Sequence, residues 1–109
     1  MDCDIHLYEY KPSIAVDFDG VIMAEGHYPN FSGSLIKKNR DLIIEKKNAG
    51  YQVIIHTCRM TDAPYNDTEI QRQGIVNYLN LHEVPFDSIW NGVGKPIADE
   101  YWDDRAVRI

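Results

Sequence analysis

Two aspartates follow a short apolar run near the start of the chain. Residues 13–16 are Ser-Ile-Ala-Val, and Asp17-Phe18-Asp19-Gly20-Val21 comes directly after them. A carboxylate at the end of a buried strand is costly unless a metal ion or a hydrogen-bonding loop receives it. Two carboxylates in different surroundings can hold different roles, one at a metal ion and a phosphorus atom, the other at a leaving group. The pattern predicts a catalytic pair, Asp17 and Asp19, and the alternative is a strand-end aspartate that begins a turn.

A hydroxyl side chain closes the second apolar run, which centres on Val53-Ile54-Ile55. The hydroxyl of Thr57, with the backbone N–H groups of the loop that begins at Cys58, can hydrogen-bond phosphoryl oxygens. Arg59 can bind a second anionic group, although a solvent-exposed arginine fits the sequence equally well. No neighbour makes Cys58 a credible nucleophile. These residues predict a phosphate-binding loop, and a purely structural Thr57 stays open.

Charged residues follow the last two predicted strands. Lys95 stands between Gly94 and Pro96, so a turn fixes it, although an isolated lysine is often only solvated. Asp103 and Asp104 come directly after Tyr101-Trp102. Adjacent like charges disfavour each other and invite a divalent cation. Together with the earlier residues, they supply a nucleophile, an acid/base, a hydroxyl and a cation for phosphate, and a metal site.

The bulk composition limits the classes of protein to consider. The chain has 109 residues, 44% of them hydrophobic and 26% charged, which is typical of one globular domain. No run approaches the roughly 18 apolar residues of a membrane span, and the acidic start does not resemble a signal peptide, so we expect a cytoplasmic protein without a membrane partner. Two cysteines do not make a disulfide framework. The net charge of −6 repels polyanions and disfavours binding driven by nucleic-acid phosphates.

The elements expected around these residues alternate between strand and helix. This alternation predicts an α/β fold, a three-layer, Rossmann-like parallel sheet with helices on both faces, formed by residues 1–109 as one domain. The expected strands are 13–18, 51–56, 85–90 and 98–103, with 5–10 as an uncertain edge strand; the expected helices run from a cap at Ser32 or Ser34 to Ala49, and from a capping box at 66–69 to His82.

This topology brings the distant polar residues together. Right-handed crossovers place the carboxyl ends of parallel strands at one edge, where ligands of such sheets bind. The aspartates near residue 17, Thr57 and the acidic pair at 103–104 all lie at or just after strand ends. We therefore expect them to converge at one site.

The ordered motifs resemble those of the haloacid dehalogenase superfamily, in its phosphatase branch. The matching residues are Asp17-Phe18-Asp19-Gly20-Val21, Thr57, Lys95 and Asp103-Asp104, and the resemblance covers residues 13–106. The run from Gly94 to Arg105 is also similar to small stand-alone members from bacteria and their phages, and to the phosphatase domain of polynucleotide kinases. The resemblance implies a magnesium-dependent phosphohydrolase that acts on a phosphomonoester through an aspartyl-phosphate.

The resemblance also implies a role for each matched position. Asp17 is the nucleophile and a Mg²⁺ ligand, while Asp19 is the general acid/base and a ligand through its backbone carbonyl. Thr57 and Lys95 bind the phosphoryl group, with Cys58 and Arg59 as neighbouring candidates. The last motif supplies the remaining metal ligand, with Asp104 preferred over Asp103.

The spacing leaves no room for an inserted cap domain. The intervals from Asp19 to Thr57 and from Thr57 to Lys95 are equal, and one loop, one helix and one strand fill each of them. A capless member has an open site, so it accepts a large substrate or borrows a lid from another subunit of a homo-oligomer. The flap at 23–31, with Glu25, His27 and Tyr28, remains to contact the leaving group. The acidic charge favours a phosphorylated small molecule, and a nucleic-acid phosphate end stays open.

Two other classes of protein use similar residues. A phospho-accepting signalling domain also combines an acidic pair, a phosphorylated aspartate, a threonine and a lysine on a parallel sheet. In receiver domains the acidic pair comes first and the acceptor lies mid-chain, whereas here the order is reversed. A non-catalytic binding domain on the same kind of fold is the third interpretation.

Overall fold

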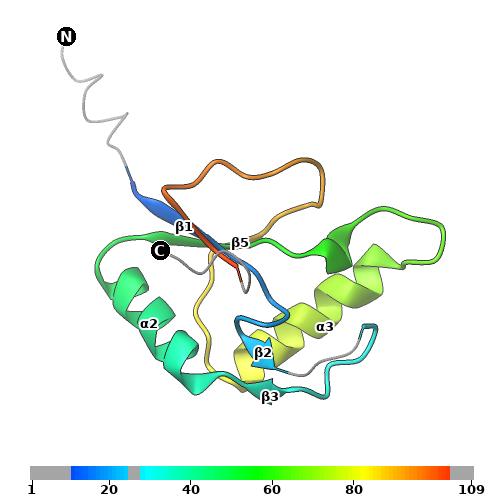
Figure 1. Cartoon of the computed structure of the whole chain (residues 1–109), viewed down its shortest axis with the longest axis horizontal. Helices are drawn as coiled ribbons and strands as arrows, with labels where there is room; N and C mark the ends of the chain where they lie inside the picture. The colour runs from blue at the N-terminus through cyan, green and yellow to red at the C-terminus, as the bar shows by residue number, and fades with distance from the viewer. Residues whose placement is uncertain (1–10, 25–27, 104–109) are drawn as a thin grey trace, which may run out of the picture.

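A parallel four-stranded sheet forms the centre of the molecule (Figure 1). The computed structural model describes residues 11–24 and 28–103, so the uncertain edge strand at 5–10 lies outside the described residues. The strand order is β5-β4-β1-β6. The strands are β1 (Ser13–Val16), β4 (Gln52–Ile55), β5 (Ser88–Ile89) and β6 (Glu100–Trp102). The predicted α/β class and parallel sheet are confirmed.

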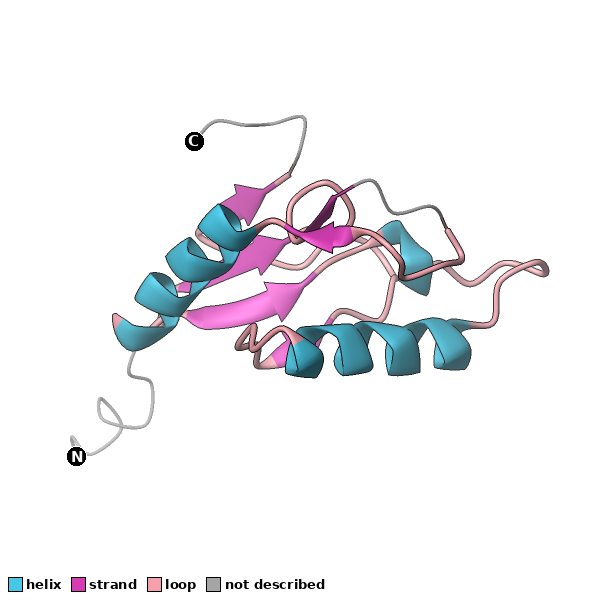
Figure 2. Ribbon diagram, turned by 90° about the horizontal axis from the view of Figure 1, so that it is seen from below, coloured by secondary structure: helices cyan, strands magenta, loops and turns pink. Residues whose placement is uncertain are grey.

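Strand β1 lies between two parallel neighbours, and all four of its residues are buried. Val16 is opposite Ile55 of β4 on one side and Trp102 of β6 on the other. A strand buried on both faces needs apolar or small residues at every position, which the sequence Ser-Ile-Ala-Val provides. Because the three strands run parallel, their carboxyl ends reach the same edge, as the arrowheads in Figure 2 show.

Two helices connect the strands, α2 (Lys37–Asn48) and α3 (Thr68–Leu81). The carboxylate of Asp67 caps α3 by accepting hydrogen bonds from the backbone N–H groups of residues 69 and 70. The serine cap predicted for α2 is wrong, because Ser34 belongs to strand β3 and the helix begins after Ile36. No helix in the described ranges is long and apolar enough to cross a lipid bilayer.

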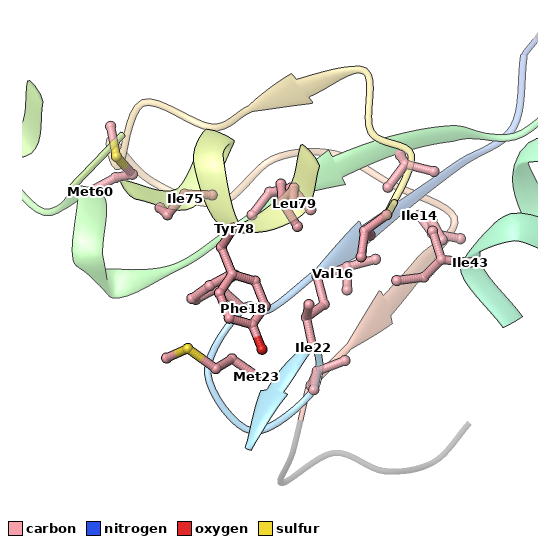
Figure 3. Close-up of a cluster of buried hydrophobic side chains, with 14 residues drawn as sticks. Ile14, Val16, Phe18, Ile22, Met23, Ile43, Met60, Ile75, Tyr78 and Leu79 are labelled. Atoms are coloured by element: carbon pink, nitrogen blue, oxygen red, sulfur yellow. The ribbon is translucent and has the colours of Figure 1, made fainter. Parts of the chain in front are cut away.

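Both helices pack on the same face of the sheet (Figure 3). Alternate residues of β1, Ile14 and Val16, join one hydrophobic cluster with Ile43 of α2 and Ile75 of α3. Residues two apart on a strand point to the same face, so α2 and α3 cover that face together. The reason is topological: both crossovers step in the same direction across the sheet, and right-handed crossovers then place their helices on one side.

The opposite face differs from the predicted arrangement with helices on both faces. In the described residues, the connection from β5 to β6 contains no helix, and it is drawn in orange above the sheet in Figure 1. No cap domain interrupts the described connections between the strands. The flap instead forms a short antiparallel pair, β2 (Met23–Ala24) with β3 (Ser34–Leu35). Two predicted flap contacts, Glu25 and His27, lie outside the described residues.

Gly74 of α3 provides a test of how the flap packs. A Cβ at this position would lie 2.2 Å from the ring of Phe31. Alanine ordinarily stabilises a helix interior by about 1 kcal/mol relative to glycine. Here the new methyl group must displace the Phe31 ring, and we expect this cost to exceed the gain in helix propensity. Gly74→Ala should therefore lower the free energy of unfolding, measured by urea denaturation, by about 1–2 kcal/mol.

The control is the same substitution in a Phe31→Ala background. There the obstacle is gone, and Gly74→Ala should restore the helix-propensity gain. Equal effects of Gly74→Ala in the two backgrounds would contradict the packing described.

Candidate active site at the carboxyl edge of the sheet

A pocket of about 500 Å³ opens at the carboxyl ends of β1, β4 and β6. It brings together five of the predicted site residues from distant parts of the chain. Its lining includes Asp17, Thr57, Cys58, Lys95 and Asp103, together with Ala15, His56, Thr61, Gly92, Gly94, Tyr101 and Trp102. The convergence predicted from the strand ends therefore occurs for these residues.

Asp17 and Asp103 occupy equivalent positions on neighbouring strands. Val16 pairs with Trp102, and the Asp17 N–H donates to the Trp102 carbonyl at 2.9 Å, so each aspartate comes one residue past this pair. Adjacent strands are roughly 4.8 Å apart, so two acidic side chains are held close together. Such a pair suits a hard divalent cation, and Mg²⁺ usually needs one or two carboxylates plus phosphate and water oxygens.

The described residues contain no group of three or more His, Cys, Asp or Glu side chains that could hold a metal ion. Asp104, the preferred metal ligand of the sequence analysis, lies outside the described residues. Among the described residues, the carboxylates that line the pocket are those of Asp17 and Asp103.

Thr57 joins β4 to the 3₁₀ helix η1 (Cys58–Met60) and is its N-cap. Its buried hydroxyl accepts a hydrogen bond from the Arg59 N–H at 3.2 Å. A hydroxyl can donate as well as accept, so the Thr57 proton can still be directed to an oxygen in the pocket. Cys58, the next residue, is exposed and lines the same pocket.

A folded loop presents Lys95 to the pocket. The indole N–H of Trp90 donates to the carbonyls of Val93 at 3.0 Å and Gly94 at 3.2 Å. Gly92 has a φ of +88°, and a Cβ there would lie 2.2 Å from the Met60 carbonyl oxygen, so only glycine allows this close approach to η1. These contacts hold the loop in one conformation, so the backbone position of Lys95 is fixed relative to the pocket.

The Lys95 ammonium lies 4.2 Å from the centre of the Tyr101 ring, a cation–π contact. His56 lines the pocket beside it. Burial lowers the pKa of His56, the positive charge of Lys95 lowers it further, and Asp103 partly opposes the shift. A neutral imidazole at neutral pH leaves Lys95 as the cation among the described lining residues.

Asp19 and Arg59 lie outside the pocket lining and bind each other. Arg59 Nε donates to Asp19 Oδ2 at 2.7 Å, and Nη2 donates to Oδ1 at 3.0 Å. The Arg59 side chain is 1% exposed and that of Asp19 is 34% exposed. A solvent-exposed Arg59 is therefore wrong. Its guanidinium binds the Asp19 carboxylate, and a contact of Arg59 with a substrate anion stays a prediction.

The remaining bonds of Arg59 connect three parts of the chain. Nη1 donates to Oε1 of Gln71 on α3 at 3.0 Å, and Nη2 donates to the Asn30 carbonyl of the flap at 2.8 Å. The ring of Phe31 lies 4.4 Å from the guanidinium carbon. The guanidinium thus fixes the orientation of Asp19 and also holds the flap against α3.

The sequence did not predict the residues that support the site residues through contacts with their side chains, Gln71 at Arg59 and Tyr101 at Lys95. Gln71, an uncharged residue on a helix, carries no signal that it will meet Arg59. Tyr101 had a weak signal, because alternation along β6 directs it away from Trp102 and toward the face without helices.

No known family model matches this sequence, and no curated protein does either. Among solved structures, the chain is similar to a chain of the Pnkp1/Rnl/Hen1 complex, with a TM-score of 0.57 and 15% sequence identity over 94% of this chain. The matched region is 31% of that chain's length. At this level of identity the likeness shows a shared α/β fold.

Removing the buried cation tests its role in holding the site. Arg59→Met leaves the Asp19 carboxylate, the Gln71 amide oxygen and the Asn30 carbonyl without the hydrogen bonds that Arg59 donates to them. We therefore expect the free energy of unfolding, measured by urea denaturation, to fall by about 3 kcal/mol. Lys47→Met is the control, because the Lys47 side chain is 39% exposed and pairs with the Asp87 carboxylate at the surface, so its loss should cost at most about 1 kcal/mol. Equal losses in the two variants would contradict the structural role of Arg59.

Proposed function

We propose that this chain is a magnesium-dependent phosphohydrolase that cleaves a phosphomonoester through an aspartyl-phosphate on Asp17. The observation that carries the proposal is the convergence of Asp17, Thr57, Lys95 and Asp103 on one pocket. A carboxylate nucleophile, a hydroxyl donor, a cation and a second carboxylate are the groups that phosphoryl transfer requires.

The phosphate-binding groups surround Asp17 from two directions. Thr57 and the Cys58 backbone approach from the end of β4, and Lys95 approaches from the loop after β5. A hydroxyl, a backbone N–H and an ammonium are all donors, so they complement the equatorial oxygens of a phosphoryl group. These donors also offset the negative net charge of the chain at the point where an anionic substrate must bind.

The carboxylates of Asp17 and Asp103 would hold the Mg²⁺ ion, together with the Asp19 carbonyl and Asp104 that the family resemblance implies. When bound, the ion supplies positive charge that lets an anionic phosphate approach an anionic carboxylate. The protein's own contribution is to orient Asp17 and to shape the pocket.

Two displacements at phosphorus complete the proposed reaction. An Asp17 oxygen forms a bond to phosphorus as the bond to the leaving oxygen breaks, and Asp19 gives its proton to that oxygen. A water molecule then attacks phosphorus, Asp19 takes the water's proton, and the bond to Asp17 breaks to release inorganic phosphate. Asp17 and Asp19 return to their starting states, so the reaction is catalytic.

Arg59 would orient Asp19 for this role, since Asp19 itself does not line the pocket. Each Asp19 oxygen accepts one hydrogen bond from the guanidinium and keeps a further lone pair, so the carboxyl group can exchange a proton while it stays oriented. Its side chain is also one-third exposed, which leaves it accessible from the solvent side.

Hydrolysis of a generic aryl phosphate with and without Mg²⁺ tests the proposal. We expect multiple turnovers that stop on chelation of the metal, and a fall in kcat of at least about 10³-fold in Asp17→Asn because the nucleophile is lost. Asp41→Asn, on the exposed surface of α2, is the matched control and should keep full activity. An inactive wild type, or an active Asp17→Asn, would remove the enzyme interpretation. A single turnover that leaves a stable acyl-phosphate would favour the signalling alternative.

The phosphate-binding groups can be tested separately. Thr57→Val and Lys95→Met should each lower kcat/KM by roughly 10²-fold, because each removes one donor to the phosphoryl group. Thr57→Ser keeps both the hydroxyl and the cap of η1, so it should remain within a few-fold of the wild type. Similar losses in Thr57→Ser and Thr57→Val would show that the hydroxyl is not the functional group.

A further inference from the structure

A second pocket of about 260 Å³ adjoins the first. Its lining consists of Tyr28, Cys58, Thr61, Tyr65 and Asn66, and two of these residues, Cys58 and Thr61, also line the larger pocket. Sites for whole small molecules usually measure about 300–1,000 Å³, so the larger pocket suits a ligand body and the smaller one suits a fragment of it. The two shared residues place the smaller pocket next to the proposed phosphate site.

Hydrogen bonds fix one wall of the smaller pocket. The Tyr28 hydroxyl donates to Asn66 Oδ1 at 2.6 Å. Asn66 Nδ2 in turn donates to the carbonyls of Arg59 at 2.8 Å and Thr61 at 2.7 Å. These bonds connect Tyr28 of the flap to the loop that follows η1. The ring is therefore already fixed before a ligand binds, and binding does not cost the conformational entropy of ordering it.

Tyr65 also lines this pocket and is 80% exposed, while Tyr28 is 44% exposed. Aromatic side chains bind flat rings by stacking, with little loss of conformational entropy because they have few rotatable bonds. The lining contains no acidic or basic side chain, so the pocket suits an uncharged ring rather than a second phosphate.

Resting on the phosphohydrolase function proposed above, we propose that this tyrosine pocket binds an aromatic ring of the leaving group, a nucleobase. In a nucleotide, a sugar separates the phosphate from the base. In this protein, two residues, Cys58 and Thr61, line both the larger pocket and the smaller one, so a ligand with its phosphate in the larger pocket could place its base in the smaller pocket. The Thr61 hydroxyl and the tyrosine hydroxyls can hydrogen-bond the polar edge of a base. A mononucleotide and the phosphorylated end of a nucleic acid share this chemistry.

Binding to the Asp17→Asn protein in the presence of Mg²⁺ tests the ring site without turnover. Adenosine 5′-monophosphate and ribose 5-phosphate carry the same phosphate and sugar, and they differ in the base. We expect calorimetric titration to show at least tenfold tighter binding of the nucleotide, the range that base–aromatic stacking provides.

Substitutions of Tyr65 locate the preference. In Tyr65→Ala the ratio of the two affinities should fall toward one, whereas Tyr65→Phe keeps the ring and should keep the ratio. Equal binding of nucleotide and sugar phosphate, or an unchanged ratio in Tyr65→Ala, would overturn the ring site even if the wild type hydrolyses phosphomonoesters. Selective nucleotide binding without hydrolysis by the wild type would support the ring site and refute the phosphohydrolase function.

A third ligand distinguishes the two sources of a nucleobase. An oligonucleotide with a terminal phosphate is titrated beside the mononucleotide, again with Tyr65→Ala for comparison. Tighter binding of the mononucleotide identifies a small-molecule substrate, as the net charge of −6 favours. Tighter binding of the oligonucleotide identifies a nucleic-acid end, and either result supports the ring site when it depends on Tyr65.

Discussion

The parallel pairing of β1 with β4 and β6 is the constraint on which the site depends. Parallel strands finish at the same edge, so residues that immediately follow the strands become neighbours although they are far apart in sequence. Asp17 and Asp103 come directly after their strands, Thr57 comes two residues after β4, and all three owe their proximity to this register. A shift of one residue in one strand would turn its side chains to the opposite face and disperse the pocket.

The second constraint is the buried guanidinium of Arg59. A buried charge is tolerated when it is paired and hydrogen-bonded, and here one cation is bound by a carboxylate, an amide and a carbonyl from different segments. The same cation orients Asp19 and anchors the flap whose Tyr28 walls the smaller pocket. Stability, the orientation of a proposed catalytic group and the shape of the smaller pocket are therefore coupled through one side chain.

The sequence allowed the α/β class, the approximate positions of the strands along the chain and five of the pocket residues to be predicted, because short apolar runs and their polar ends are local signals. It did not allow the position of Arg59 to be predicted, since its burial depends on Gln71 and Phe31, which meet it only in the folded chain. The helix arrangement differed for a similar reason. The connection after β5 is long enough to cross the sheet, yet it closes through the contacts of Trp90 and Gly92 rather than as a helix.

The sheet face without helices has one more consequence. Ala15 of β1 is a buried residue in the middle of the sheet and also lines the larger pocket, because it points away from the face that the helices cover. The central strand therefore contributes a methyl-bearing residue to the lining of the pocket. A larger side chain at position 15 would occupy part of the pocket. The size of this one residue therefore affects both the packing of the sheet and the room left for a ligand.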